Sequence, residues 1–133
     1  FVGHRTHQSA RYQISHANRS ENQSSSGVIV STGTGATGWA RSIMNTTGQS
    51  IALSPTDRRL AFFVREPWPS VATGATITVG AADHAAPLVV RSQMNDGGVV
   101  FADGIEQDFL QFGWGRTVSV RPSARSFNLV QPA

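Results

Sequence analysis

Residues 27–39 read G-V-I-V-S-T-G-T-G-A-T-G-W. The β-branched run Val28 to Val30 predicts a buried strand, and the residues after the loop, from Ala40 on, predict one or two turns of helix that end near Asn45 to Gly48. In the loop between them, glycines alternate with threonines. Glycine allows close backbone approach, and threonine adds hydroxyls beside amides that a helix start leaves unpaired. This stretch therefore predicts a strand, a short helix, and between them a loop suited to an oxygen-rich ligand.

Short apolar runs recur along the rest of the chain, at spacings of roughly 10 to 15 residues. They are Leu60–Val64, Ala75–Val79, Leu88–Val90, Val99–Ala102, Thr117–Val120 and Phe127–Val130. Short runs separated by turn residues are typical of an antiparallel β-sandwich rather than of alternating strands and helices. We therefore predict a mainly β fold, an antiparallel β-sandwich with one short helix after Thr37.

The segments between these runs carry turn and loop chemistry. Asn95-Asp96-Gly97-Gly98 predicts a hairpin turn, and Asp103-Gly104 predicts a second turn. Glu66-Pro67-Trp68-Pro69 predicts a rigid connection, with the rim of a pocket as the alternative. Residues 11–15 alternate only weakly, and Ala17 to Ser26, rich in Asn, Ser and Gln, has a loop composition.

Length and composition indicate one domain over residues 1–133. The chain has no cysteine, which excludes disulfides and thiolate metal sites. No apolar run has the length of a membrane span, and the first residues do not resemble a signal peptide, so we expect a cytoplasmic protein. The abrupt apolar start at Phe1-Val2, without an initiator methionine, leads us to expect a part of a longer protein.

All 11 basic residues are arginine, against 8 carboxylates, for a formal net charge of +3. Arg5, Arg11 and Arg19 predict a mildly anion-attracting edge. Nucleic acid is not an expected partner, because the chain has neither a dense basic cluster nor interleaved aromatic residues. His4 and His7 lack an apparent third ligand, so no metal site is predicted. The absence of a G-x-S-x-G elbow excludes a serine hydrolase of that type.

The glycines at positions 33, 35 and 38 also satisfy the dinucleotide-binding pattern G-x-G-x-x-G. A Rossmann unit would need a full crossover helix and a parallel strand, and neither is expected here. A P-loop is excluded because the chain has no lysine to reach the phosphates. A tight strand-to-helix turn, with glycines serving geometry alone, stays open as an alternative.

Residues 27–39 resemble the signature G-x-x-V-S-T-P-T-G-S-T-A-Y that opens the C-terminal domain of NAD kinases. Asp103-Gly104, Phe112-Gly113 and Thr117–Val120 are similar to the closing pattern of that domain, and Phe1 to Tyr12 falls where a strand precedes the signature. The resemblance implies a C-terminal β-sandwich that clasps substrate against an N-terminal α/β domain. The family transfers a phosphoryl group from ATP or polyphosphate to the 2′-hydroxyl of NAD, giving NADP, with a divalent cation such as Mg²⁺.

The same resemblance implies how the work is divided between the domains. The family's Gly-Gly-Asp-Gly loop and Asn-Glu pair are absent from this chain. We therefore expect no catalytic residue here, no activity from this chain alone, and a missing N-terminal domain as its partner. Family members associate through the C-terminal domain, which implies a homo-oligomer.

For substrate binding, the resemblance places Thr37, Gly38 and Trp39 beside the dinucleotide, with Thr34 and Gly35 shaping the floor of the loop. Threonine hydroxyls suit ribose or carboxamide groups, and a flat aromatic ring can cover a base or a nicotinamide. Core packing is the alternative role for Trp39.

This sequence departs from the signature at several positions. Gly33 replaces its proline, Ala36 its second serine, Gly38 its alanine and Trp39 its tyrosine, while Ser26 stands where an acid is common. These changes leave the acceptor open. The alternatives are a related kinase domain with a lipid, sugar or other acceptor, and a non-catalytic β-sandwich that binds anionic partners through its arginines.

Overall fold

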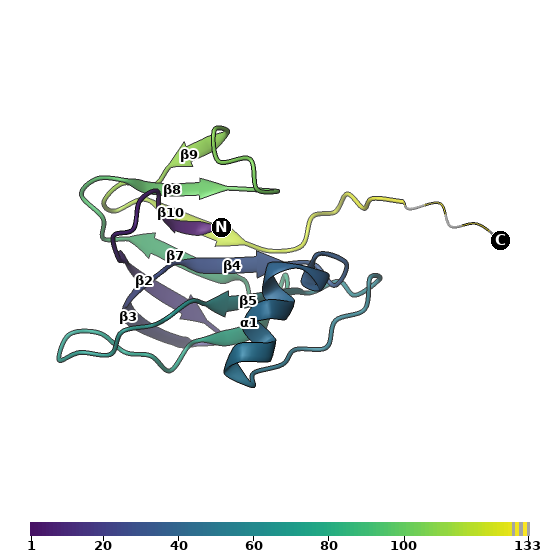
Figure 1. The fold of residues 1–133 in the computed structure, drawn as a ribbon, viewed down its shortest axis with the longest axis horizontal. Helices are drawn as coiled ribbons and strands as arrows, with labels where there is room; N and C mark the ends of the chain where they lie inside the picture. The colour runs from purple at the N-terminus through teal and green to yellow at the C-terminus, as the bar shows by residue number, and fades with distance from the viewer. Residues whose placement is uncertain (129, 131, 133) are drawn as a thin grey trace.

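In the computed structural model, which describes residues 1–128, 130 and 132, two antiparallel sheets face each other as a sandwich (Figure 1). The larger sheet has six strands, which in spatial order are β6 (Val79–Ala82), β5 (Leu60–Val64), β4 (Val28–Ser31), β1 (Val2–His4), β8 (Gly98–Phe101) and β9 (Phe109–Gln111). The smaller sheet has four strands, β10 (Thr117–Val120), β7 (Leu88–Ser92), β2 (Ala10–His16) and β3 (Arg19–Ser25). A 3₁₀ turn, η1 (Gly35–Thr37), leads into α1 (Trp39–Thr47). The mainly β, sandwich-like prediction with a short helix after Thr37 is confirmed.

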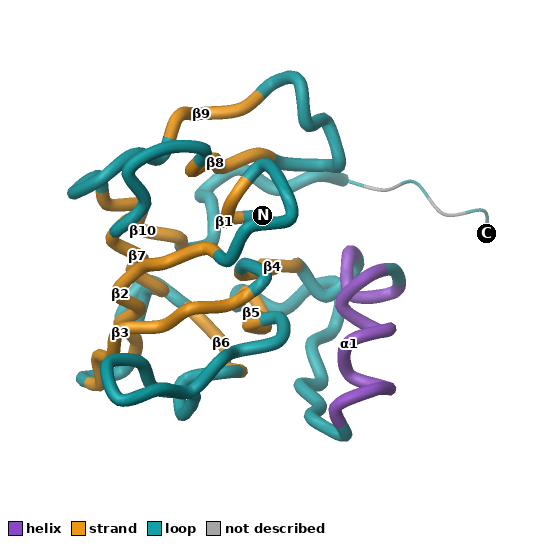
Figure 2. The backbone as a smooth tube through the Cα atoms, turned by 60° about the vertical axis from the view of Figure 1, so that its left-hand side comes forward, coloured by secondary structure: helices purple, strands orange, loops and turns teal. Residues whose placement is uncertain are grey.

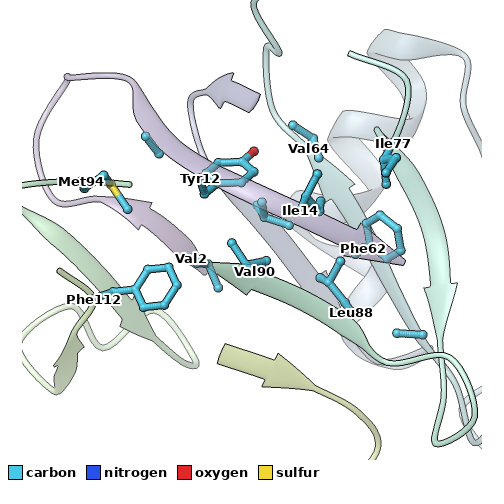
Figure 3. Packing of buried hydrophobic residues seen from close by; sticks show 13 residues of the cluster. Val2, Tyr12, Ile14, Phe62, Val64, Ile77, Leu88, Val90, Met94 and Phe112 are labelled. Atoms are coloured by element: carbon cyan, nitrogen blue, oxygen red, sulfur yellow. The ribbon is translucent and has the colours of Figure 1, made fainter. Parts of the chain in front are cut away.

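The core lies between the two sheets (Figure 3). On β2, buried Tyr12 and Ile14 alternate with exposed Arg11 and Gln13, the period of two expected of a strand with one buried face. The other sheet supplies, among others, Phe62. The remaining buried members of the cluster are Val2, Ala10, Val28, Val64, Ile77, Ala82, Leu88, Val90, Met94 and Phe112.

The segment 17–26, predicted as a loop, contains strand β3, so that prediction is wrong. β3 pairs with β2 in register from Ala10↔Ser25 to His16↔Arg19, and Ala17 and Asn18 form the two-residue turn. Both turn residues have positive φ, 49° and 63°, as a type I′ hairpin turn requires. A polar sequence can form this strand because β3 is at the edge of its sheet.

The polar residues of β3 that turn inward are hydrogen-bonded in the core. Burial raises the pKa of Tyr12 above its ordinary value, so its hydroxyl stays protonated. That hydroxyl donates to Gln23 Oε1 at 3.1 Å and lies 2.6 Å from Ser25 Oγ. Because these buried groups satisfy one another, the strand needs no apolar pattern to bury its inner face.

Three further predictions need correction. Ala75–Val79 is not a strand, since β6 begins only at Val79. The amides of Thr76 and Ile77 donate hydrogen bonds to the carboxylate of Glu21 instead of to a neighbouring strand. Asn95–Gly98 is not a hairpin turn, since it links β7 and β8, which belong to different sheets. In the run Phe127–Val130, Phe127, Asn128 and Val130 lie outside any strand, and Leu129 lies outside the described residues. The remaining apolar runs coincide with β5, β7, β8 and β10.

Helix α1 covers only part of the outer face of the six-stranded sheet (Figure 2). Its residue Ala40 packs with Phe63 and Ala61 of β5. Cross-strand pairing places Ile29 on the same face as Phe63, and Val99, Phe101 and Phe109 also lie on that face. The part of this face formed by β1, β8 and β9 thus lies beside the helix rather than beneath it.

Candidate functional site

The Gly/Thr loop is wound around Thr32. The Thr32 hydroxyl accepts a hydrogen bond from the Gly35 amide at 3.0 Å, and the Thr32 carbonyl accepts one from the Ala36 amide at 3.0 Å. A Cβ on Gly33 would lie 2.1 Å from the carbonyl oxygen of Ser54, so only glycine fits there. Internal bonds therefore fix the shape of the loop.

The predicted binding residues of this loop lie on the surface. Thr34, Gly35, Thr37 and Gly38 are exposed, and Trp39 is 48% exposed. The Thr37 hydroxyl donates to the Thr34 carbonyl at 3.2 Å, and a hydroxyl that donates can still accept a hydrogen bond. The loop is therefore accessible to a ligand.

Helix α1 begins without a cap. Its N-cap residue is Gly38, no side chain bonds to the first amides, and the first turn carries no acidic residue. Unpaired amides at a helix start attract anionic or oxygen-rich groups. The uncapped start of α1 directly follows the turn that carries the exposed Thr34 and Thr37.

Two cavities adjoin the loop on the outer face of the six-stranded sheet, and we refer to them together as the trough. The first has a volume of about 460 Å³, and its lining includes Thr32, Gly35, Trp39 and Asp103. The second, of about 610 Å³, includes Ser26 and Trp39 in its lining. Both cavities are lined by Phe1, Trp39 and Phe101, so this aromatic cluster lies where the two cavities meet.

Trp39 is the centre of that cluster. Its ring is stacked on Phe1 with an interplanar angle of 9° and a centroid separation of 6.2 Å, and the ring of Phe101 lies 5.0 Å from that of Phe1. Arg65 also contacts the Trp39 ring. Trp39 is therefore neither a buried core residue nor a free platform, since part of its surface already has partners.

Ser26 belongs to a second polar group, in the lining of the second cavity. Its hydroxyl donates to a carboxylate oxygen of Glu66, and Arg65 Nη2 lies 4.0 Å from the other oxygen of the same carboxylate. Glu66 has a positive φ of 47°, in the left-handed region that non-glycine residues seldom adopt. This backbone conformation and the Ser26 hydroxyl together hold a carboxylate beside the second cavity.

The Asp103-Gly104 turn lies across the first cavity from the glycine loop. Both residues have positive φ, 56° and 70°, and both line the cavity. The turn prediction is confirmed, and the structure adds a carboxylate at the rim of the trough.

The structure brings some predicted site residues together and leaves others apart. Gly35 and Trp39 line the first cavity, and Ser26 and Trp39 line the second. Thr34, Thr37 and Gly38 lie in the exposed loop beside the trough rather than in its lining. Of the three arginines expected to form one edge, Arg5 lines the second cavity, whereas Arg19 bonds to Thr76.

Glu66 lines the second cavity, in agreement with the alternative prediction of a pocket rim at Glu66–Pro69. Sequence reasoning missed Phe1, Arg65 and Phe101 as neighbours of the loop. Nothing in their local sequence signals this, because they come from separate strand ends. His4, Arg5 and His7 add basic side chains to the second cavity, and Glu66 and Glu106 add acidic ones. His4 Nδ1 accepts a hydrogen bond from the amide of Thr6.

No family model matches the chain, and no curated protein matches it. Within the described residues, no three His, Asp or Glu side chains are grouped so as to hold a metal ion. None of the helices described here has the length and apolar character needed to cross a bilayer.

Proposed function

We propose that this domain binds the dinucleotide NAD in the trough, as the C-terminal part of an NAD kinase-like phosphotransferase. The observation that carries the proposal is that the Gly/Thr loop and the uncapped start of α1 open onto the trough at Gly35 and Trp39. Amide and hydroxyl hydrogen-bond donors thus lie beside an aromatic surface, and this combination suits a ligand made of sugars, phosphates and flat bases.

The two cavities have the size range of small-molecule sites. A dinucleotide has two flat ring systems joined by a diphosphate, and the trough has two lobes joined at Trp39. In the proposed pose, one ring system lies in each lobe beside the aromatic cluster. The diphosphate passes the glycine loop, where side chains are smallest.

In this proposal the domain positions the acceptor and does not break bonds. Its threonine hydroxyls and the uncapped amides at the start of α1 orient the ribose. Phe1, Trp39 and Phe101 exclude water from one side of the ribose. ATP and a divalent cation, when bound, supply the phosphoryl group and its charge neutralisation. We assign the binding of ATP and of the cation to the parent protein, because the Gly-Gly-Asp-Gly loop of the family that this chain resembles is absent from the sequence.

Calorimetric titration of the chain with NAD tests the proposal. Thr37→Val and Trp39→Ala should each weaken binding, by about tenfold or more if an interaction worth about 1.4 kcal/mol is lost. Trp68→Ala is the matched control, because Trp68 is 72% exposed and lines neither cavity. Heats equal to those of the unmodified chain in both loop variants would remove the loop from the site.

A lipid acceptor is the second candidate, since Phe1, Ile29 and Phe101 give the first cavity an apolar side. Titration with vesicles containing diacylglycerol, next to the NAD titration and a sugar panel, separates the two. Binding to the vesicles that Trp39→Ala abolishes, without any NAD heat, would favour the lipid.

A further inference from the structure

The connection between β5 and β6 holds two large apolar side chains in solvent. Trp68 is 72% exposed, and Val71 is fully exposed. Residues 67–82, which include both, contain no charged side chain. The connection reaches the margin of the molecule (Figure 1). An uncharged loop that presents a tryptophan and a valine to solvent marks a surface for association.

Two hydrogen bonds hold the base of this loop against the edge strand β3. The Trp68 amide donates to the Ser24 carbonyl at 2.7 Å, and the Gly74 amide donates to the Asn22 carbonyl at 2.8 Å. Since both acceptors belong to one strand, residues 69–73 form a short excursion whose two ends lie close together. A proline on each side of Trp68 further restricts the backbone. Little conformational entropy is therefore lost when Trp68 is bound.

Several polar groups of this excursion are paired within it. The Ser70 amide donates to the Thr73 carbonyl at 2.9 Å, and the Ala72 amide donates to the Ser70 hydroxyl oxygen at 3.2 Å. The Thr73 hydroxyl donates to the Trp68 carbonyl at 2.7 Å, which leaves the Ser70 hydroxyl to donate to Thr73 Oγ1 at 2.8 Å. Polar groups that are already paired cost little to remove from water, as entry into an apolar phase requires.

We propose that this loop docks on the surface of a lipid bilayer, with Trp68 at the level of the headgroups and Val71 among the first acyl carbons. An indole ring joins an apolar body to a donor N–H, and tryptophan is enriched at membrane interfaces for that reason. A protein partner would be met by a polar rim around the apolar anchor, whereas Ser70 and Thr73 use their hydroxyls internally. The internal pairing therefore favours the bilayer.

Opposite charges are paired at the base of the loop. Arg19 donates to the Thr76 hydroxyl, which in turn donates to the carboxylate of Glu21. On the other side, Arg65 Nη2 lies 4.0 Å from a carboxylate oxygen of Glu66. Because these charges offset one another, we expect the insertion of apolar side chains to drive docking, with zwitterionic lipid sufficient for it. The docking is independent of the trough, since Trp68 lines neither cavity.

Co-sedimentation of the 133-residue chain with phosphatidylcholine vesicles that contain no diacylglycerol tests the proposal. The unmodified chain should sediment with the vesicles, and Trp68→Ala should weaken binding by about tenfold or more, because a large buried apolar surface is lost. Val71→Asp should weaken binding similarly, since a carboxylate would have to leave water. Trp114→Ala is the matched control and should leave binding unchanged, because Trp114 is 66% exposed on another loop.

Tryptophan fluorescence with brominated phosphatidylcholine locates the contact. Quenching by the bromine atoms should be the same in Trp114→Ala as in the unmodified chain. It should be lost in Trp68→Phe, which keeps an aromatic ring in the loop and therefore most of the binding. Circular dichroism establishes that each variant is folded.

A chain that does not sediment with the vesicles would overturn the proposal. Binding that folded Trp68→Ala and Val71→Asp leave unchanged would also overturn it, and so would binding that Trp114→Ala abolishes. Any of these results would assign the exposed Trp68 to a protein partner instead.

Discussion

The guanidinium of Arg65 lies 4.7 Å from the centre of the Trp39 ring. Arg65 follows β5 and Trp39 begins α1, so this contact ties the start of the helix to the end of a central strand. A cation over an indole ring contributes about 0.5 to 1 kcal/mol at a partly exposed site. The contact also leaves the guanidinium close to any ligand that reaches Trp39.

A double-mutant cycle should detect this contact. We expect Arg65→Met and Trp39→Leu to show a coupling of about 0.5 to 1 kcal/mol in the free energy of unfolding, measured by urea denaturation. Arg65→Lys should keep part of it, because the charge remains. Strictly additive energies would mean that the two side chains do not stabilise each other.

The carboxylate of Glu21 organises the segment that precedes β6. It accepts hydrogen bonds from the amides of Thr76 and Ile77 at 2.9 and 2.8 Å and from Gln23 Nε2 at 2.6 Å. Partial burial acts to raise the pKa of Glu21, but these bonds outweigh it, and the pKa lies below the ordinary value of 4.5. The folded state therefore favours the ionised carboxylate.

This shift predicts a pH dependence of stability. Because the pKa is lower in the folded state, the contribution of Glu21 is present above pH 4.5 and is lost as the pH falls through the folded-state pKa. Glu21→Gln should lower the free energy of unfolding at neutral pH by about 1 to 3 kcal/mol and flatten this acid limb. Glu106→Gln, on an exposed loop, is the control. An acid limb that is equally steep in Glu21→Gln would contradict the assignment.

Gly33 is required by a neighbouring backbone rather than by a ligand. An added Cβ would meet the Ser54 carbonyl carbon at 2.6 Å as well as its oxygen, so the two segments must separate. Gly33→Ala should cost about 1 to 3 kcal/mol of folding free energy, measured by thermal or urea unfolding. Gly113→Ala should be far milder, because nothing lies within 4 Å of its Cβ position. Equal effects of the two changes would refute the steric explanation.

The turn between β2 and β3 can be stabilised by residues that suit its conformation better. An alanine with φ of 49° is disfavoured, whereas Asn-Gly is the preferred pair for this turn type. Replacing Ala17 by Asn together with Asn18 by Gly should raise the free energy of unfolding by about 1 kcal/mol. The midpoint of urea denaturation reports it, with an unchanged slope. A lower midpoint would show that the turn geometry is not type I′.

Local patterns explain why much of the fold could be predicted. Leu60–Val64 and Thr117–Val120 coincide with β5 and β10, because a short apolar run bounded by turn residues carries its strand signal within itself. The strand, loop and helix around the glycines could be predicted for the same reason. β3 was missed because its stability comes from pairing with β2 and from the buried Tyr12 hydroxyl, which an Asn/Ser/Gln composition does not reveal.

The candidate site, like the fold, could be predicted from the sequence only in part. The exposed threonines and the helix start could be named from residues 27–39, because each depends on near neighbours. The trough could not, since its lining is assembled by the strand order β4-β1-β8-β9 from segments far apart in the chain.

The amino-acid sequence alone determined that this protein is mainly β, with a glycine-rich loop that leads into one helix, because backbone preferences act over a few residues. Only the tertiary structure decided which part of the outer face of the larger sheet α1 leaves uncovered, and which distant side chains contact Trp39 there. Those outcomes depend on pairing between strands that are far apart in the chain, and a local sequence pattern does not reveal which strands pair.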